Sequence, residues 1–338
     1  MVTLGISEAL RNYVNRVVSL VDPFINEVVQ GEPKGLYDAS IYLIKAGGKR
    51  LRPTFVCLAT ELFGGDIGRA IPAAAAIEIL HNFTLIHDDV MDRDEFRRGV
   101  PTVHKVWGEP MAILAGDLLF AKSYEALLKL KDRGVPPNIV TKCVNELTWG
   151  AITVAEGQAL DMSFESKWDV TLDEYLTMIY KKTAALFMVS VSLGSLVAGA
   201  SERDVALMKE YAKNVGIAFQ IRDDILGLIG DEETLGKPVL SDLREGKKTV
   251  LVIYALSKLG DDGVKFLKSI LGRRDASLSE LRRAADLITG TGAIEYSERL
   301  ADEYRRRGLE ALSKVDMKNK DAYKLLTELT NYLITRVK

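Results

Sequence analysis

Apolar residues recur every three or four positions along most of the chain, which is the spacing of a buried helix face. Segments containing glycine, proline or several charges separate these stretches, and no run of alternating strands with hairpin turns occurs. The pattern therefore predicts a nearly all-helical fold. The predicted helices cover residues 6–30, 36–46, 53–63, 68–93, 110–130, 136–163, 171–200 and 202–229, with further helices beyond.

Glycine, proline and hydroxyl residues mark several helix ends. Gly47–Gly48 predicts a helix C-terminus, and Pro53 suits the opening turn of the next helix. The sequence TLDE, which starts at Thr171, predicts a capping box. No linker rich in proline and serine divides the chain, so we expect one domain over residues 1–338.

The longest apolar stretch, Ala184–Ala200, contains serine and glycine and is shorter than the span of about 20 residues that a bilayer requires. We expect a buried helix there and no transmembrane segment. The N-terminal sequence MVTLGISEALRNYV is amphipathic, unlike a signal peptide. Cys57 and Cys143 lie in apolar helical surroundings, which favours buried free thiols in a reducing compartment. These features together predict a cytoplasmic protein.

The overall charge is nearly balanced, with 45 lysines and arginines against 47 acidic residues. Such a balance is not typical of a nucleic-acid-binding protein. Apolar residues make up 47% of the chain, which is ample for a globular core. Because the total charge is nearly balanced, any site for an anion must be a local cluster of basic residues.

A dense group of carboxylates follows the apolar run 70–86. Two unit charges 4 Å apart repel by about 4 kcal/mol at an effective dielectric constant near 20, and the C-terminal end of a helix further disfavours anions. Asp88 and Asp92 are four residues apart and share the helix face that is buried. Exposure to solvent at the end of the helix accounts for the charges of Asp94 and Glu95, but not for Asp88 and Asp92, which project toward the core. Mg²⁺, which prefers carboxylates and phosphate oxygens, would make them tolerable.

A second acidic pair occurs in the same context. The sequence QIRDDILG (220–227) resembles LIHDDVMD (85–92), and each follows a long apolar helical run. We therefore expect Asp223, with Asp224 as a further candidate, to form a second wall of the same metal site.

Basic residues accompany both acidic segments. The loop AGGKRLRPT (46–54) offers backbone N–H groups and three cations, which suit a phosphate group. Each basic residue alone is typical of a solvated surface, but together they indicate a site for two polyanions. The candidates are Lys49, Arg50, Arg52, Arg97, Arg98, Lys181, Lys182, Lys237, Lys247 and Lys248.

The residue types in the sequence exclude several classes of enzyme mechanism. The sequence has no Ser/His/Asp set, no suitable nucleophilic cysteine and no GxxxxGK[ST] loop. Metal ions and cations around a diphosphate favour its departure as a leaving group. If the organic part is allylic, departure leaves a carbocation, which requires a dry apolar pocket. The His87–Asp88 pair leaves a metal phosphohydrolase open as an alternative.

The combined motifs resemble those of the trans-type isoprenyl diphosphate synthases, and are closest to the archaeal-type geranylgeranyl diphosphate synthases. The resemblance runs from about residue 40 to 255 and follows the family's order of motifs. The motifs are GGKRLRP, DDVMD (88–92), RRG, KT (182–183), FQ (219–220), DDILG (223–227) and GKKT (246–249).

The resemblance implies the isoprenoid synthase type I fold, an all-α bundle around a deep central cavity, in a homodimer. It implies a Mg²⁺-dependent prenyltransferase that condenses dimethylallyl, geranyl or farnesyl diphosphate with isopentenyl diphosphate, head to tail, to geranylgeranyl diphosphate (C20). Two or three Mg²⁺ per active site would be bound by Asp88, Asp92 and Asp223. The resemblance assigns binding of the allylic diphosphate to Arg97, Lys182, Lys237 and Lys247. It assigns binding of isopentenyl diphosphate to Lys49, Arg52, His81 and Arg98. Thr183 and Gln220 would contact the developing cation.

Two positions refine this expectation. The family's second motif often ends in a third aspartate, but Gly227 stands there, so we expect Asp231 or a water molecule to supply the missing oxygen. Phe83 lies five residues before the first motif, where the family places an aromatic residue that closes the tail tunnel at C20. The alternatives are a farnesyl or a longer-chain (C25–C30) synthase, a phosphohydrolase and a non-catalytic prenyltransferase subunit.

Overall fold

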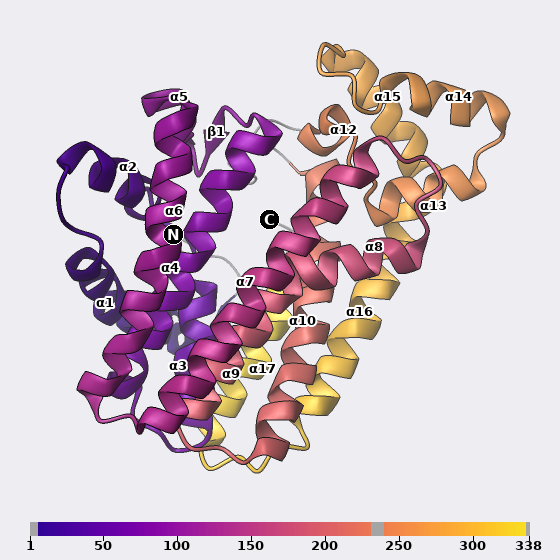
Figure 1. The fold of residues 1–338 in the computed structure, drawn as a ribbon. Coiled ribbons are helices and arrows are strands. Elements are labelled where there is room, and N and C mark those ends of the chain that lie inside the picture. Colours follow the sequence, from indigo (N-terminus) through magenta and orange to yellow (C-terminus); the bar gives the residue numbers. More distant parts are fainter. Residues whose placement is uncertain (1–5, 231–239, 336–338) are drawn as a thin grey trace.

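The computed structural model describes residues 6–230 and 240–335, and these residues are almost entirely helical (Figure 1). The first half contains α1 (Glu8–Val28), α2 (Lys34–Lys45), α3 (Leu51–Leu62), α4 (Ile67–Asp92), β1 (Phe96–Arg97), β2 (Val100–Pro101), α5 (Val103–Trp107), α6 (Glu109–Leu128), the 3₁₀-helix η1 (Lys129–Arg133) and α7 (Pro137–Glu165). The second half contains α8 (Leu172–Ile179), the π-helix η2 (Tyr180–Ala184), α9 (Ala185–Val197), α10 (Glu202–Ile229), α12 (Ser241–Glu245), α13 (Val250–Lys258), α14 (Asp261–Ile270), α15 (Leu278–Thr289), α16 (Ala293–Leu312) and α17 (Lys320–Thr335).

The predicted all-α fold is confirmed, and each predicted helix up to residue 229 is present with ends within three residues of the expected ones. The capping box at the start of α8 is also confirmed. The Thr171 side chain accepts a hydrogen bond from the Glu174 N–H at 3.2 Å, and the Glu174 carboxylate accepts one from the Thr171 N–H at 2.9 Å. The expected domain limits, 1–338, stay a prediction.

Two local features were not predicted. The segment between α4 and α5 contains a short antiparallel hairpin, in which Phe96 pairs with Pro101 and Arg97 with Val100. The predicted helix over 171–200 is interrupted by the π-helix η2, which the apolar periodicity of the segment does not reveal. Such π-helical insertions often occur at functional sites.

Helix α9 forms the centre of the core, and all of its residues are buried. Phe187 of α9 packs edge-to-face against Phe55 of α3, with ring centroids 5.4 Å apart. By length and composition, two helical stretches, Ile67–Asp92 and Leu172–Val197, could cross a membrane, but 72% of the most apolar window in each is buried inside the protein. Burial in the core therefore accounts for their apolar character, as expected for Ala184–Ala200.

Long helices run alongside one another, and their ends position the site. Helix α4 packs against α6 and α3, and α10 packs against α16 and α9. The C-terminal end of α4, the β1–β2 hairpin and α12 lie at the same end of the molecule (Figure 1). Both cysteines are free and buried, as predicted.

Candidate active site

A cavity of about 850 Å³ opens at this end of the bundle. Residues of α3, α4, α7, η2, α10 and α12 line it, so segments far apart in the sequence meet there. Asp88 and Asp223 both line this cavity. The two acidic segments therefore face a common space, which is the arrangement that the metal hypothesis requires.

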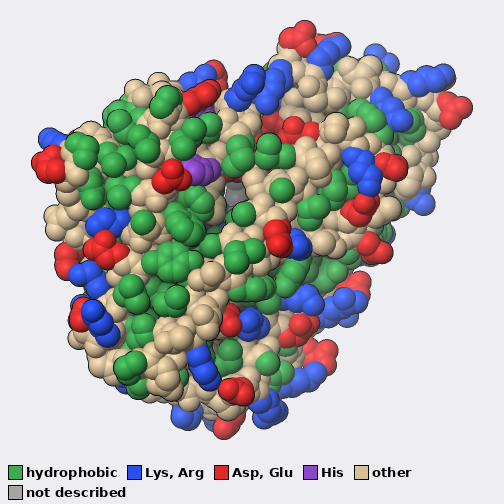
Figure 2. Space-filling model, viewed as in Figure 1, with side chains coloured by type: hydrophobic (Ala, Val, Ile, Leu, Met, Phe, Trp, Pro, Cys, Tyr) green, Lys and Arg blue, Asp and Glu red, His purple; other side chains and the backbone are tan. Residues whose placement is uncertain are grey.

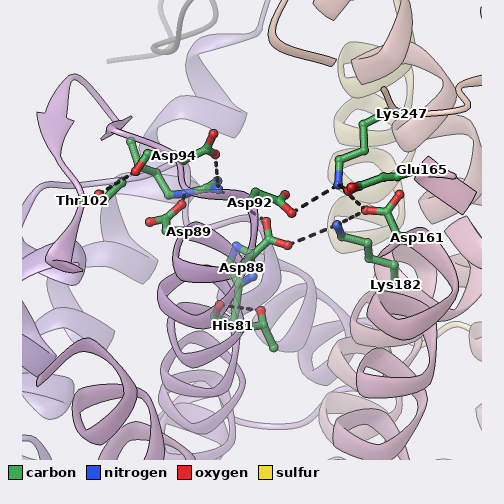
Figure 3. Close-up of polar contacts among 12 residues, drawn as sticks. His81, Asp88, Asp89, Asp92, Asp94, Thr102, Asp161, Glu165, Lys182 and Lys247 are labelled. Atoms are coloured by element: carbon green, nitrogen blue, oxygen red, sulfur yellow. Dashed lines mark hydrogen bonds and ion pairs between the residues drawn. The ribbon is translucent and has the colours of Figure 1, made fainter. Parts of the chain in front are cut away.

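The first acidic wall is the last turn of α4, where Asp88 and Asp92 point across the cavity toward two lysines (Figure 3). Asp88 Oδ1 lies 3.2 Å from Lys182 Nζ, and Asp92 Oδ1 lies 3.3 Å from Lys247 Nζ. Burial and the neighbouring Asp88 raise the pKa of Asp92 to about 6. Burial also disfavours ionised Asp88, but Lys182, Arg97 and Lys247 outweigh it and lower its pKa.

This wall fits a hard divalent cation. Asp88 Oδ1 is buried and lies 3.2 Å from Lys182 Nζ, but it accepts no hydrogen bond of good geometry from the described residues, so a metal ion could replace the lysine as its partner. Within residues 6–230 and 240–335, no three His, Cys, Asp or Glu side chains lie close enough to hold a metal by themselves. Mg²⁺ typically takes one or two carboxylates, water and substrate phosphates, so a site of this kind suits Mg²⁺ bound together with a diphosphate.

Asp89, unlike Asp88 and Asp92 of the same motif, does not face the two lysines. It is buried and forms a short ion pair with Arg97, which also contacts Asp94 Oδ2 at 3.3 Å and Asp88 Oδ2 at 3.5 Å. Burial raises the pKa of Asp89 to about 7, although Arg97 opposes the shift. Asp89 and Asp94 thus hold the Arg97 guanidinium at the edge of the first acidic wall.

The second acidic wall lies on α10. Asp223 and Asp224 both line the cavity, and the buried Asp224 accepts hydrogen bonds from Tyr175 Oη at 2.6 Å and Gln220 Nε2 at 2.8 Å. Burial and the nearby Asp242 raise the pKa of Asp224 to about 8. The Gln220 Oε1 atom in turn accepts a hydrogen bond from Thr183 Oγ1 at 2.7 Å. This chain fixes the orientation of the Gln220 amide and leaves Asp223 as the candidate metal ligand.

Gly227, which stands where the family often has a third aspartate, lies beside Asp242, a neighbour that the sequence did not indicate. A Cβ atom built on Gly227 would lie only 2.7 Å from Asp242 Oδ2. The Asp242 carboxylate therefore occupies the space beside Gly227 and also lines the cavity. The expected substitute, Asp231, lies outside the described residues, as does Lys237.

Basic side chains surround the part of the cavity near α3. The buried Arg52 Nε donates no hydrogen bond to the described residues, and burial lowers the pKa of Arg52 to about 10, so it stays charged at neutral pH. Burial and the adjacent arginines lower the pKa of His81, which is therefore neutral. Arg98 donates to the carbonyl of Leu43 at 2.8 Å, and Lys49 lines the same cavity. The structure thus brings all four predicted residues together.

Arg50 differs from its predicted neighbours in the basic loop. Its guanidinium pairs with Asp22 of α1 at 2.9 Å and with Glu78 of α4 at 3.1 Å. A second hydrogen bond to Asp22 completes a fork, so Arg50 joins three helices. These contacts hold the start of α3 against α1 and α4.

Phe83 lines the cavity on α4, one turn before His87. Its ring packs edge-to-face on His87 at 4.9 Å and on Phe120 of α6 at 5.4 Å between centroids. A helical wheel alone places Phe83 off the face of Asp88, so its position in the cavity depends on the packing of α4 against α6. His87 faces Ile113 of α6, with Nε2 3.0 Å from the carbonyl oxygen, whereas Asp88 contacts Lys182 and Arg97. This separation disfavours a joint His87–Asp88 metal site.

Sequence reasoning missed two acidic residues of α7. Asp161 Oδ2 lies 2.6 Å from Lys182 Nζ and 3.0 Å from Lys247 Nζ, and Glu165 Oε1 lies 3.0 Å from Lys247 Nζ. Part of the signal was present, because Gln158 and Asp161 are three residues apart on the predicted helix 136–163. Glu165 follows four residues after Asp161 and shares their face because α7 continues two residues past the expected end.

The fold and the cavity together define an all-α protein in which opposed acidic segments and a set of cations share one deep pocket. Comparison with known proteins gives the family. The polyprenyl synthetase family model matches residues 33–288. A geranylgeranyl diphosphate synthase from Sulfolobus acidocaldarius is 47% identical over 97% of this chain and 98% of that protein. The chain belongs to the polyprenyl synthetase family.

Two further proteins illustrate the range of relatives. A geranylfarnesyl diphosphate synthase from Aeropyrum pernix is 45% identical over 94% of this chain and all (100%) of that protein. The crystal structure of a polyprenyl synthase from Caulobacter crescentus, complexed with calcium and isoprenyl diphosphate, matches with a TM-score of 0.91 and 31% identity. That match covers 99% of this chain and 100% of the other.

Proposed function

We propose that the protein is a Mg²⁺-dependent prenyltransferase that condenses an allylic diphosphate with isopentenyl diphosphate, head to tail, and releases geranylgeranyl diphosphate. One observation carries the proposal: Asp88 and Asp92 face Lys182 and Lys247 at the mouth of a cavity of about 850 Å³. Carboxylates for a divalent ion and ammonium groups for phosphate oxygens therefore meet above an apolar chamber.

The allylic diphosphate binds between the two acidic walls in this proposal. Asp88, Asp92 and Asp223 hold Mg²⁺, which when bound stabilises the negative charge that develops on the leaving diphosphate. Lys182, Lys247 and Arg97 bind its oxygens, together with Lys237, which lies outside the described residues. Two or three ions per site agree with three ligating carboxylates, and a structural relative was solved with calcium and isoprenyl diphosphate.

Departure of the diphosphate leaves an allylic cation, which the deeper residues protect. Thr183 and Gln220 present fixed oxygen atoms near the reacting carbon, because Thr183 donates its hydroxyl proton to Gln220. Leu186, Met178 and Phe219 line the cavity and exclude water from the cation. The reaction then joins this carbon to the double bond of isopentenyl diphosphate, and the resulting cation loses a proton to the departed diphosphate, which restores a double bond.

Isopentenyl diphosphate binds at the basic end of the cavity in this proposal. Lys49, Arg52 and Arg98 supply positive charge, and the neutral His81 supplies a ring N–H. The support is the Arg52 Nε atom, a buried donor that donates no hydrogen bond to the described residues. A buried guanidinium donor of this kind is costly unless an anion binds it.

The test is product analysis on the purified protein. Incubation with Mg²⁺, labelled isopentenyl diphosphate and farnesyl diphosphate should give a C20 chain on chromatography. A C25 product would instead place this chain with relatives named geranylfarnesyl diphosphate synthase. Release of phosphate without a new carbon–carbon bond would favour a phosphohydrolase, and an inactive isolated chain would favour a non-catalytic subunit.

The proposal includes a homodimer in the cytoplasm. Hydrophobic side chains gather on the face of the molecule over α6 and α7 (Figure 2). The exposed apolar residues of these two helices include Ile113, Leu114 and Phe120 of α6 and Ile152 and Met162 of α7, with Leu114 53% and Ile152 56% exposed. Large exposed apolar patches mark protein–protein contacts, and a second copy of this chain is the partner that we propose.

A further inference from the structure

One carboxylate oxygen of Asp161 contacts both lysines that face the first acidic wall. Asp161 Oδ2 lies 2.6 Å from Lys182 Nζ and 3.0 Å from Lys247 Nζ. Lys182 belongs to η2 and Lys247 to the segment after α12, so Asp161 joins two segments that are not neighbours in the sequence. Asp161 is buried. Its neighbour on α7, Glu165, contacts Lys247 but not Lys182.

Each lysine lies between Asp161 and an aspartate of α4 (Figure 3). The distances to Asp88 and Asp92, 3.2 and 3.3 Å, are longer than those to Asp161. An aspartate oxygen that coordinates Mg²⁺ loses much of its attraction for a lysine. When Asp88 and Asp92 bind metal, the two ammonium groups therefore need another anion to hold them in place.

We infer that Asp161 is a positioning residue, which keeps Lys182 and Lys247 side by side for the oxygens of the allylic diphosphate while Asp88 and Asp92 bind Mg²⁺. This inference rests on the proposed function. Two ammonium groups that converge on one phosphate group repel each other, and a buried carboxylate shared between them offsets that repulsion. Without it, the lysines separate or turn to Asp88 and Asp92, where they compete with the metal.

The same two elements provide a matched control. Glu156 of α7 pairs with Lys181 of η2 at 2.6 Å, and neither residue is among those that line the cavity. The Glu156–Lys181 pair joins α7 to η2 just as Asp161–Lys182 does, but it contacts neither metal ligand. A purely structural connection between α7 and η2 would make the two acidic residues equivalent.

The test measures binding of inorganic pyrophosphate in the presence of Mg²⁺ by isothermal titration calorimetry, on wild-type protein, Asp161→Asn and Glu156→Gln. Asp161→Asn should weaken binding by about tenfold or more, the loss expected for a charge-assisted contact. Glu156→Gln should bind like wild type. In steady-state assays, Asp161→Asn should raise the KM for the allylic diphosphate and leave the KM for isopentenyl diphosphate unchanged.

Wild-type affinity for pyrophosphate in folded Asp161→Asn, or an equal loss in Glu156→Gln, would overturn the inference. If Asp161→Asn does not fold, Asp161→Glu provides the test, because it keeps the charge but moves the oxygen by one methylene group. Asp161→Glu should bind pyrophosphate more weakly than wild type, and equal affinity would overturn the inference. Wild-type protein that binds no pyrophosphate and forms no product would contradict the proposed function itself.

Discussion

Buried charge at single residues defines the chemistry of this cavity. Asp88, Asp92, Lys182 and Lys247 are largely removed from water, and such groups are costly unless each has a partner of opposite charge. Here each aspartate pairs with a lysine across the cavity, Asp88 with Lys182 and Asp92 with Lys247. In the proposed complex these pairs separate, because the aspartates bind the metal and the lysines bind the diphosphate. A network of this kind is typical of a binding site, since charge burial alone rarely increases stability.

At Phe83, the size of one side chain is expected to set the product length. Phe83→Ala removes the ring that packs on His87 and Phe120 and deepens the cavity. We expect products longer than C20, because the growing tail gains room where the ring stood. Chromatography of the dephosphorylated products measures this. Phe266→Ala, which removes an aromatic ring outside the cavity, should keep the C20 product; a C20 product from Phe83→Ala would show that another residue closes the tunnel.

At Gly227, an added side chain is expected to destabilise the protein. Gly227→Asp places a Cβ atom 2.7 Å from Asp242 Oδ2 and adds a second carboxylate beside it. We expect a loss of about 1–3 kcal/mol in the free energy of unfolding, as for other overpacked sites. Urea denaturation measures the loss. The double variant Gly227→Asp/Asp242→Gly should recover part of it, and a fully stable single variant would contradict this account of the site.

Among the secondary structure elements, η2 has the most specific link to the site. The π-helix carries Lys182 and Thr183, and α7 crosses it at Gly157. A Cβ atom on Gly157 would lie 2.3 Å from the Lys182 backbone nitrogen, so only glycine allows this approach. The close contact between α7 and η2 places Asp161 within reach of Lys182.

Gly157→Ala is therefore expected to displace η2. Small displacements of positioning residues can cost about 100-fold in rate, so kcat/KM for the allylic diphosphate should fall by at least about tenfold. The control is Gly150→Ala on the same helix, where a Cβ atom would collide with the Val189 side chain, 2.5 Å away, instead of the η2 backbone. Gly150→Ala should lose stability but keep its KM. Equal kinetic effects of the two variants would refute a specific role for Gly157.

For the whole molecule, the exposed apolar residues of α6 and α7 predict association of two copies. Light scattering after size-exclusion chromatography should give twice the mass of the 37.3 kDa chain. Leu114→Lys, which places a charge in the proposed interface, should shift the protein toward the monomer at micromolar concentration. Leu278→Lys, at a comparably exposed leucine of α15, should leave the dimer intact. A monomeric wild-type protein would rule out the homodimer.

Local patterns along the chain determine most of this fold. The spacing of apolar residues predicted the helices, the TLDE sequence predicted the capping box of α8, and the aspartates that follow two apolar helical runs, in DDVMD and DDILG, indicated both acidic walls. These features depend on neighbours within a few positions along the chain, which is why the sequence by itself was sufficient.

Contacts between distant segments required the tertiary structure. The shared Asp161 oxygen, the Asp242 carboxylate beside Gly227 and the Phe83 ring in the cavity each depend on how two helices pack. From the sequence, Asp231 or a water molecule was expected to supply the oxygen missing at Gly227, and the family resemblance, not the helical spacing, assigned Phe83 to the tail tunnel. Periodicity identifies the buried face of a helix but neither the helix that it meets nor the register of the contact, so only the packed structure decided which charges share this cavity.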